Sequence, residues 1–224
     1  MSLVLFAIAP VFVILTYIYI QDKYEKEPLG LLLLNFFLGA VVSIIIVTVI
    51  YLFTGHFLPL TDEFSIWQQF IQAFLVVALS EEFSKYIIVK YFAQPRKAFN
   101  EPYDGIVYAV MVSMGFACTE NVLYVLDGGY QTAVLRAFTA VPAHATFGIL
   151  MGYYMGLAKF SKNRLQLNLT GLFLAVIFHG AYDFFLFINF VPGISIGAFV
   201  SLIIAIVLSK KAIKKHQENS NFKT

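Results

Sequence analysis

The residues best suited to chemistry in this chain are acidic and imidazole side chains that stand inside long apolar stretches. An ionisable group near the centre of a bilayer is costly, so it is usually paired, directed into a cavity or functional. Five such residues are candidate catalytic groups: Glu81, Glu82, Glu120, His144 and His179. Three polar neighbours are candidate supporting groups: Lys85, Asn121 and Asp183.

The spacing of these residues indicates how their charges are arranged on each helix. Glu81 and Glu82 precede Lys85 by four and three positions, so the lysine can neutralise one carboxylate while the other points about 100° away. His179 and Asp183 are also four apart, which lets the carboxylate bind one imidazole nitrogen and orient the other. The pattern predicts one free glutamate and one oriented imidazole, and leaves open which glutamate is the base.

The elements that must position these groups are long apolar blocks. The chain has 224 residues, of which 60% are hydrophobic and 12% charged, whereas soluble domains contain roughly half apolar and a quarter charged residues. The blocks run over 2–20, 29–53, 67–92, 104–126, 131–158, 168–190 and 191–209. Most of them approach or exceed the ~20 residues that a membrane-spanning helix needs. We therefore predict an all-α, polytopic transmembrane helix bundle of about seven spans, with residues 1–209 as a single domain.

The basic residues predict the orientation of this bundle. They cluster near 23–26, 90–97, 159–164 and 210–223, and are absent from the intervening connections near 54–66, 127–130 and 191–193. Short cytoplasmic loops collect Lys and Arg. We therefore expect the N-terminus outside the cell membrane, the C-terminus in the cytoplasm, and 210–224 as a basic cytoplasmic tail. A rise of ~1.5 Å per residue then places the candidate residues of four helices in one layer of the outer half of the bilayer.

Other features near these residues are assigned to structure. Pro142 lies two residues before His144, and we expect it to kink that helix and open a cavity. Arg136 is expected to extend to the membrane surface or to pair with Asp127, and it is assigned no chemistry. A small-residue stripe is expected to allow close helix packing: Gly148, Gly152 and Gly156. Two histidines outside the apolar centres are expected to be solvated: His56 and His216.

At these residues the chain resembles the PrsW family of polytopic bacterial membrane proteases, which is related to CAAX-processing and bacteriocin-processing membrane peptidases. The resemblance covers most of the chain, in the family's order: Asp22-Lys23-Tyr24-x-x-Glu27-Pro28, Glu81-Glu82-x-x-Lys85, Tyr103-Asp104-Gly105-Ile106-Val107-Tyr108, Gly115-Phe116, Glu120-Asn121, His144 and His179-Gly180-x-x-Asp183. Where the wider clan often has Phe-x-x-x-His, this chain has Phe116-x-x-x-Glu120, as PrsW-like members do.

The resemblance implies an intramembrane endopeptidase that acts in a bacterial stress response. Its implied substrate is a single-span membrane protein of the anti-sigma-factor kind, cut on the extracytoplasmic side in the first step of regulated proteolysis. The expected partners are this substrate and the lipid bilayer, with no nucleic acid. The sequence leaves the oligomeric state open.

Peptide hydrolysis requires an activated water, a stabilised oxyanion and a proton for the leaving amine. We expect Glu81 or Glu82 to activate water and the two histidines to donate hydrogen bonds or a proton, without a cofactor.

Three alternatives remain open. In the first, zinc is held by His144, His179 and a carboxylate from Glu120 or Asp183, with Glu81 as the base, although no His-Glu-x-x-His motif occurs. In the second, the buried groups serve an ion-coupled transporter. In the third, they are structural contacts between helices.

Overall fold

The computed structural model describes residues 2–220, 222 and 223. These residues form helices and connecting turns without a strand, which confirms the predicted all-α bundle. The α-helices are α1 (Leu3–Gln21), α2 (Leu29–Phe37), α3 (Ile44–Phe57), α4 (Ile66–Phe70), α5 (Leu79–Ile88), α6 (Pro102–Phe138), α7 (Ala140–Lys159), α8 (Arg164–Phe187) and α9 (Ile196–Glu218). Three π-helical segments continue them: η1 (Leu38–Ser43), η2 (Ile71–Ala78) and η3 (Val89–Ala93).

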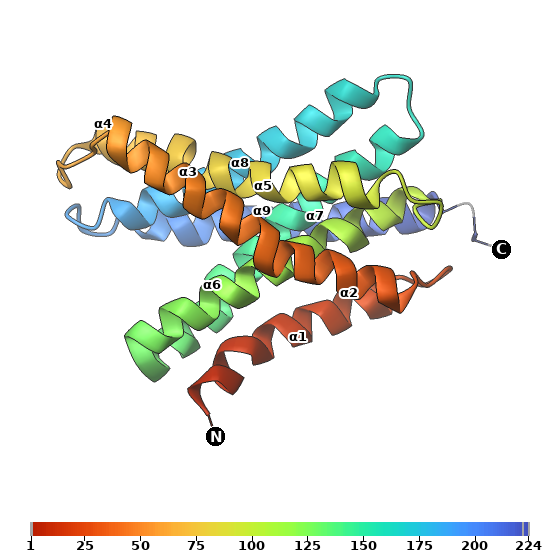
Figure 1. Ribbon diagram of the computed structural model, residues 1–224, viewed down its shortest axis with the longest axis horizontal. Coiled ribbons are helices and arrows are strands. Elements are labelled where there is room, and N and C mark those ends of the chain that lie inside the picture. Colours follow the sequence, from red (N-terminus) through yellow and green to blue (C-terminus); the bar gives the residue numbers. More distant parts are fainter. Residues whose placement is uncertain (1, 221, 224) are drawn as a thin grey trace.

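Five stretches of the described chain are long and apolar enough to cross a membrane: Leu3–Gln21, Leu29–Phe57, Pro102–Lys159, Arg164–Phe187 and Ile196–Glu218. The third of them contains both α6 and α7, which run side by side in opposite directions (Figure 1). Residues 67–92, expected to form the third span, are divided among α4, η2, α5 and η3 and are not among the five. The count of seven spans therefore stays a prediction.

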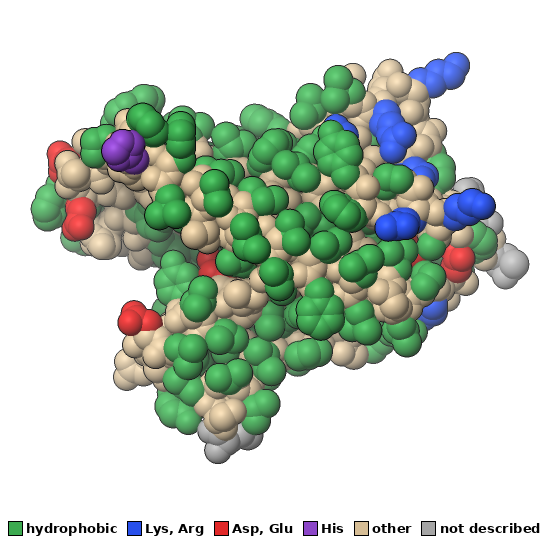
Figure 2. All heavy atoms as spheres, viewed as in Figure 1, with side chains coloured by type: hydrophobic (Ala, Val, Ile, Leu, Met, Phe, Trp, Pro, Cys, Tyr) green, Lys and Arg blue, Asp and Glu red, His purple; other side chains and the backbone are tan. Residues whose placement is uncertain are grey.

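The charged and apolar surfaces are separated along the long axis of the molecule. On the face in Figure 2, Lys and Arg side chains gather at one end, and apolar side chains cover the middle. We call this end the basic end. The turn between α3 and α4 lies at the opposite end (Figure 1). Basic loops on one side are what the proposed orientation requires, and the orientation itself stays a prediction.

Helix α6 is the centre of the bundle. Every residue from Tyr103 to Ala117 is buried. A Cβ added to Gly152 would collide with the carbonyl oxygen of Gly105, and one added to Gly156 with that of Pro102. The glycine stripe of α7 therefore packs against the α6 backbone, as the sequence predicts.

The chain turns where the sequence predicts a connection, near 127–130. Helical geometry breaks at Gly129, where φ is 72°, and Arg136 beyond it contacts Glu120 at 2.5 Å, so the chain turns back at Gly129 and a short helical segment continues to Phe138. Glycine adopts this left-handed conformation without the steric cost of a Cβ. The segment that follows this turn brings Arg136 to the rim of the functional cavity described below.

Three sequence expectations near the helix ends need revision. Pro142 does not line the functional cavity but a groove formed with α1 and α9, so its predicted role in opening that cavity is wrong. His216 is buried rather than solvated, and its Nε2 lies 3.0 Å from the Tyr153 carbonyl oxygen. Helix α9 continues through Lys210 to Glu218, into the predicted tail. Residues 221 and 224 of that tail lie outside the described residues.

Candidate active site

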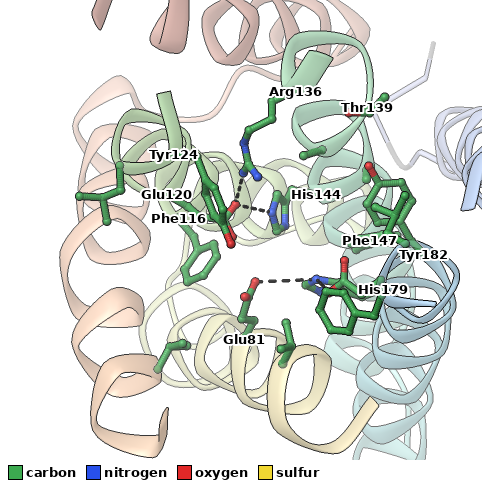
Figure 3. A pocket seen from close by; sticks show the side chains of 18 of the residues that line it. Glu81, Phe116, Glu120, Tyr124, Arg136, Thr139, His144, Phe147, His179 and Tyr182 are labelled. Atoms are coloured by element: carbon green, nitrogen blue, oxygen red, sulfur yellow. Dashed lines mark hydrogen bonds and ion pairs between the residues drawn. The ribbon is translucent and has the colours of Figure 1, made fainter. Parts of the chain in front are cut away.

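The candidate catalytic residues converge on one cavity of about 550 Å³ between α3, α5, α6, α7 and α8. Its lining includes Glu81, Glu120, His144, His179 and Asp183. Figure 3 shows Glu81, Glu120 and the two histidines directed toward one another from four helices. The lining also takes residues from α3 and from the α6–α7 turn, and Figure 2 shows a hollow between these parts of the molecule. The layer of polar groups predicted from the sequence therefore corresponds to a cavity.

The two adjacent glutamates occupy different positions around α5. The Lys85 Nζ lies 2.7 Å from Glu82 Oε1 and 3.6 Å from Glu81 Oε2. Glu82 is fully buried and does not line the cavity, whereas Glu81 does. The lysine thus pairs most closely with Glu82, and the carboxylate that faces the cavity is Glu81.

His179 is held between carboxylates. Its Nδ1 lies 2.8 Å from Glu82 Oε1, and its Nε2 lies 3.2 Å from Asp183 Oδ2 and 3.9 Å from Glu81 Oε2. Its ring stacks on Phe147 at a centroid distance of 4.9 Å. The contact with Asp183 is the one that the four-residue spacing predicts, and it fixes the ring beside Glu81.

His144 joins the α5 lysine to Glu120. Its Nδ1 lies 3.3 Å from Lys85 Nζ, and its Nε2 lies 3.0 Å from Glu120 Oε2. A lysine ammonium can only donate a hydrogen bond. The Nδ1 of His144 is therefore the acceptor in this arrangement, and the Nε2–H donates to Glu120.

Arg136 is a site residue that the sequence interpretation missed. Its Nη2 lies 2.5 Å from Glu120 Oε2, its Nε donates to Asn121 Oδ1 at 2.7 Å, and its guanidinium covers the Tyr124 ring at 4.1 Å. Asn121 in turn donates to the Ala7 carbonyl oxygen at 2.6 Å. The expected surface position or pairing of Arg136 with Asp127 is therefore wrong. A single arginine inside the 131–158 apolar block was the signal that could have identified it.

Tyr51 was also missed. This α3 residue lines the cavity, and its hydroxyl donates to Glu81 Oε1 at 3.1 Å. Tyrosine is common in membrane helices, so its residue type gave no signal. The contact makes α3 a wall of the site and fixes one oxygen of the Glu81 carboxylate.

Four donors at the centre of the site form a group that can hold a metal ion: Glu81, Glu82, His144 and His179. One ligand atom from each lies within 4.8 Å of the others, and all four residues are buried. The Oε2 atoms of both glutamates have no hydrogen-bond partner. Two imidazoles with carboxylates are ligands that zinc accepts, so the donor types fit this metal.

The compact donor group overlaps only in part with the zinc ligands considered from the sequence. His144 and His179 belong to both sets. Glu120 and Asp183 are outside the compact group and instead contact the histidine Nε2 atoms. Carboxylates in this position orient imidazole ligands, so they fit a supporting role better than direct ligation.

Comparisons with known proteins identify related proteases. Residues 27–211 match the family described as PrsW family intramembrane metalloprotease. The chain is 40% identical to Protease PrsW of Geobacillus kaustophilus, over 83% of this chain and 80% of that protein. It is 41% identical to Protease PrsW of Oceanobacillus iheyensis, over 83% of each chain, and 38% identical to that of Bacillus subtilis, over 80% of each. No solved structure matches.

The fold, the site and these relatives define a membrane-embedded peptidase, which is a hydrolase in a multi-pass membrane protein. The chain belongs to the PrsW family of intramembrane proteases.

Proposed function

We propose that this cavity hydrolyses a peptide bond of a membrane-anchored protein, with Glu81 as the base that activates water. One observation carries the proposal: of the two adjacent glutamates, Glu81 faces the cavity, and its buried Oε2 has no hydrogen-bond partner. Glu82 does not line the cavity, and its Oε1 contacts Lys85 and His179. A general base must reach the proton that it removes, and Glu81 is the carboxylate placed to do so.

In this reaction Glu81 takes one proton from water, and the remaining hydroxide attacks the carbonyl carbon of the peptide bond. His144 and His179 donate hydrogen bonds to the oxyanion that forms, when their Nε2–H groups exchange Glu120 and Asp183 for it. The C–N bond then breaks, and Glu81 returns its proton to the leaving amine. The products are a carboxylic acid and an amine, and the site returns to its starting charge.

The supporting residues hold these groups in place. Lys85 balances the charge of Glu82, Asp183 orients His179, and Asn121 orients Arg136 against Glu120. Groups positioned in advance lose little free energy to reorganisation during the reaction.

A zinc-dependent version of the same hydrolysis is the second candidate, supported by the compact donor group and the family's description. His144, His179 and one of the two adjacent glutamates would hold the ion. Bound zinc would lower the pKa of its water and polarise the substrate carbonyl. Glu81 keeps its position as the base when Glu82 is the ligand.

The substrate that we propose is a single-span protein of the anti-sigma-factor kind, cut on its extracytoplasmic side. The position of the cavity supports a cut on this side. Its rim residues Tyr124 and Arg136 lie on either side of the turn at Gly129, which is not one of the loops that carry the basic clusters. Apolar residues line much of it, including Leu123, Leu135 and Leu186. Such walls suit the side chains of a transmembrane segment.

The test is cleavage of co-expressed single-span proteins by the wild type and by Glu81→Gln, with Glu63→Gln in the exposed α3–α4 connection as the matched control. We expect cleavage to vanish in Glu81→Gln at normal abundance and to persist in Glu63→Gln. Loss of wild-type cleavage in a chelator, restored by zinc, would select the zinc-dependent version. Undiminished cleavage by Glu81→Gln would refute the role of Glu81.

A further inference from the structure

Two motifs that the active site does not use meet at the basic end of the molecule. The loop between α1 and α2 carries Asp22-Lys23-Tyr24-x-x-Glu27-Pro28, and the start of α6 carries Tyr103-Asp104 and Tyr108. Together they contribute five carboxylates, which we call the acidic cluster: Asp22, Glu25, Glu27, Glu101 and Asp104. Four of these residues are at most 3% exposed, Glu25 being the exception. A buried concentration of negative charge requires compensation.

No lysine or arginine in the described part of the chain forms an ion pair with the acidic cluster. The nearby Lys26 ammonium donates instead to the backbone carbonyl oxygens of Tyr19 and Asp22. Within the described residues, Glu27 and Asp104 therefore have no ion-pair partner.

Glu27 and Asp104 form the centre of the cluster. Asp104 Oδ2 accepts hydrogen bonds from the backbone N–H groups of Asn100 and Glu101, at 2.7 and 2.8 Å. Glu27 Oε2 accepts from the Tyr108 hydroxyl, and the Glu27 and Asp104 carboxyl groups interact directly. Hydrogen bonds donated to one side of a carboxylate orient its other side toward a cation.

Several polar atoms around this pair lack a protein partner. They include Asp104 Oδ1, both oxygens of Asp22, Asn100 Oδ1 and the Tyr103 hydroxyl. Tyr103 is not acidic and is only 2% exposed, and its hydroxyl lies within electrostatic reach of Asp22 and Glu101. Buried polar groups in native proteins bond to protein, water or ions. An unpartnered hydroxyl near carboxylate oxygens that lack a partner marks a place where water molecules or a hydrated ion can bond.

We propose that the acidic cluster binds a hydrated divalent cation of the Mg²⁺ type, with Glu27 and Asp104 as its protein ligands. Three surrounding groups bond to its water molecules: Asp22, Asn100 and Tyr103. Mg²⁺ keeps several waters and typically takes one or two carboxylates, whereas Ca²⁺ takes 6–8 oxygen ligands. In the described chain, the compact group of four metal-binding residues lies at the active site and not in the acidic cluster. A cluster with a single close carboxylate pair therefore suits the ion that retains its waters.

The cation ties the α1–α2 loop to the start of α6. Glu120 lies further along α6, so the ion anchors the helix that supplies an active-site carboxylate. This binding does not depend on the proposed hydrolysis, because none of its residues lines the active-site cavity.

Mn²⁺ serves as the spectroscopic probe of the purified full chain. Titration followed by electron paramagnetic resonance should show a bound Mn²⁺ that Mg²⁺ displaces, with affinity reduced at least tenfold in Glu27→Gln. A glutamine still accepts the Tyr108 hydrogen bond, so this variant keeps the local structure. Glu218→Gln, in an exposed carboxylate outside the cluster, and the active-site variant His144→Ala should bind the probe as the wild type does.

Thermal unfolding gives a second readout. At tenfold excess over its dissociation constant, Mg²⁺ should raise the Tm by about 3–6 °C in the wild type and not in Glu27→Gln. Absence of wild-type Mn²⁺ binding would overturn the proposal and leave the cluster with protons and water alone. Equal binding by the wild type and Glu27→Gln, with loss in His144→Ala, would overturn it by assigning the ion to the active site.

Discussion

Replacement of Lys85 by methionine tests the electrostatic arrangement of the site most directly. The Lys85 ammonium is 1% exposed and lies 2.7 Å from Glu82, 3.6 Å from Glu81 and 3.3 Å from His144. Methionine has a similar length and no charge. The variant therefore removes the charge that balances two buried carboxylates while it largely fills the same space.

The expected loss of stability follows from these distances. With an effective dielectric constant of about 20, the two contacts contribute gross attractions of about 6 and about 5 kcal/mol. Part of this is offset in the wild type by the cost of burying the charges, and removal of one partner from a buried pair costs about 3–5 kcal/mol. For a chain of this length, that corresponds to a Tm lowered by about 6–20 °C.

The assay is thermal unfolding of the purified protein, with Lys85→Met/Glu82→Gln as the matched double variant. Because the double variant removes both charges of the closest pair, we expect it to recover most of the lost Tm. Glutamine at position 82 still accepts a hydrogen bond from His179. A Lys85→Met variant as stable as the wild type would refute the reasoning, and so would a double variant less stable than the single one.

Three further predictions address the base, the missed arginine and pH. Glu81→Gln should lower the cleavage rate by about 10²–10⁴-fold with little change in Tm, because general-base catalysis contributes this much; a rate assay at matched abundance measures it. Arg136→Gln should lower the free energy of unfolding, measured by thermal unfolding, by about 1–3 kcal/mol because it leaves the charge of Glu120 without its arginine. Arg136→Lys should not restore the full stability, since lysine cannot bridge Glu120 and Asn121 as the guanidinium does. The pKa of Asp22 rises from 3.8 to about 6 on folding, so binding of its proton stabilises the folded state. This contribution, at most about 3 kcal/mol, is fully present below about pH 4 and is lost as the pH rises through 6. Unfolding measured without divalent cations should show this decline, and Asp22→Asn should reduce it; a pH profile unchanged by Asp22→Asn would contradict the assignment.

Much of the fold could be predicted because apolar blocks and basic loops report directly on membrane insertion. The connection expected near 127–130 is where the structure breaks helical geometry, at Gly129. The contact between Arg136 and Glu120 shows that the chain turns back there. Glycine allows the positive φ that this turn requires.

The contacts within one helix were predictable, whereas those between helices were not. The four-residue spacing gave the pair of His179 and Asp183. No spacing rule relates Arg136 to Glu120, sixteen residues away across a turn, or Tyr51 to Glu81, thirty residues away. Their partners depend on how the helices pack, and periodicity within a helix carries no information on that.

The direction in which Pro142 points could have been predicted from helical geometry. Residues two apart on a helix point about 200° apart. With His144 directed into the functional cavity, Pro142 had to face the other side of α7, where the structure places it against α1 and α9.

The close packing of α6 on α7 also determines which wall of the active site can move. Backbone contacts at Gly152 and Gly156 leave no space for the two helices to slide or rotate past one another. The distance between Glu120 on α6 and His144 on α7 is therefore held by the main chain rather than by side-chain rotamers. Helix α3 lines the cavity through side chains, of which Tyr51 contacts Glu81. We therefore expect α3, rather than the α6–α7 pair, to move when a substrate as wide as a helix enters, while Glu120 and His144 keep their geometry.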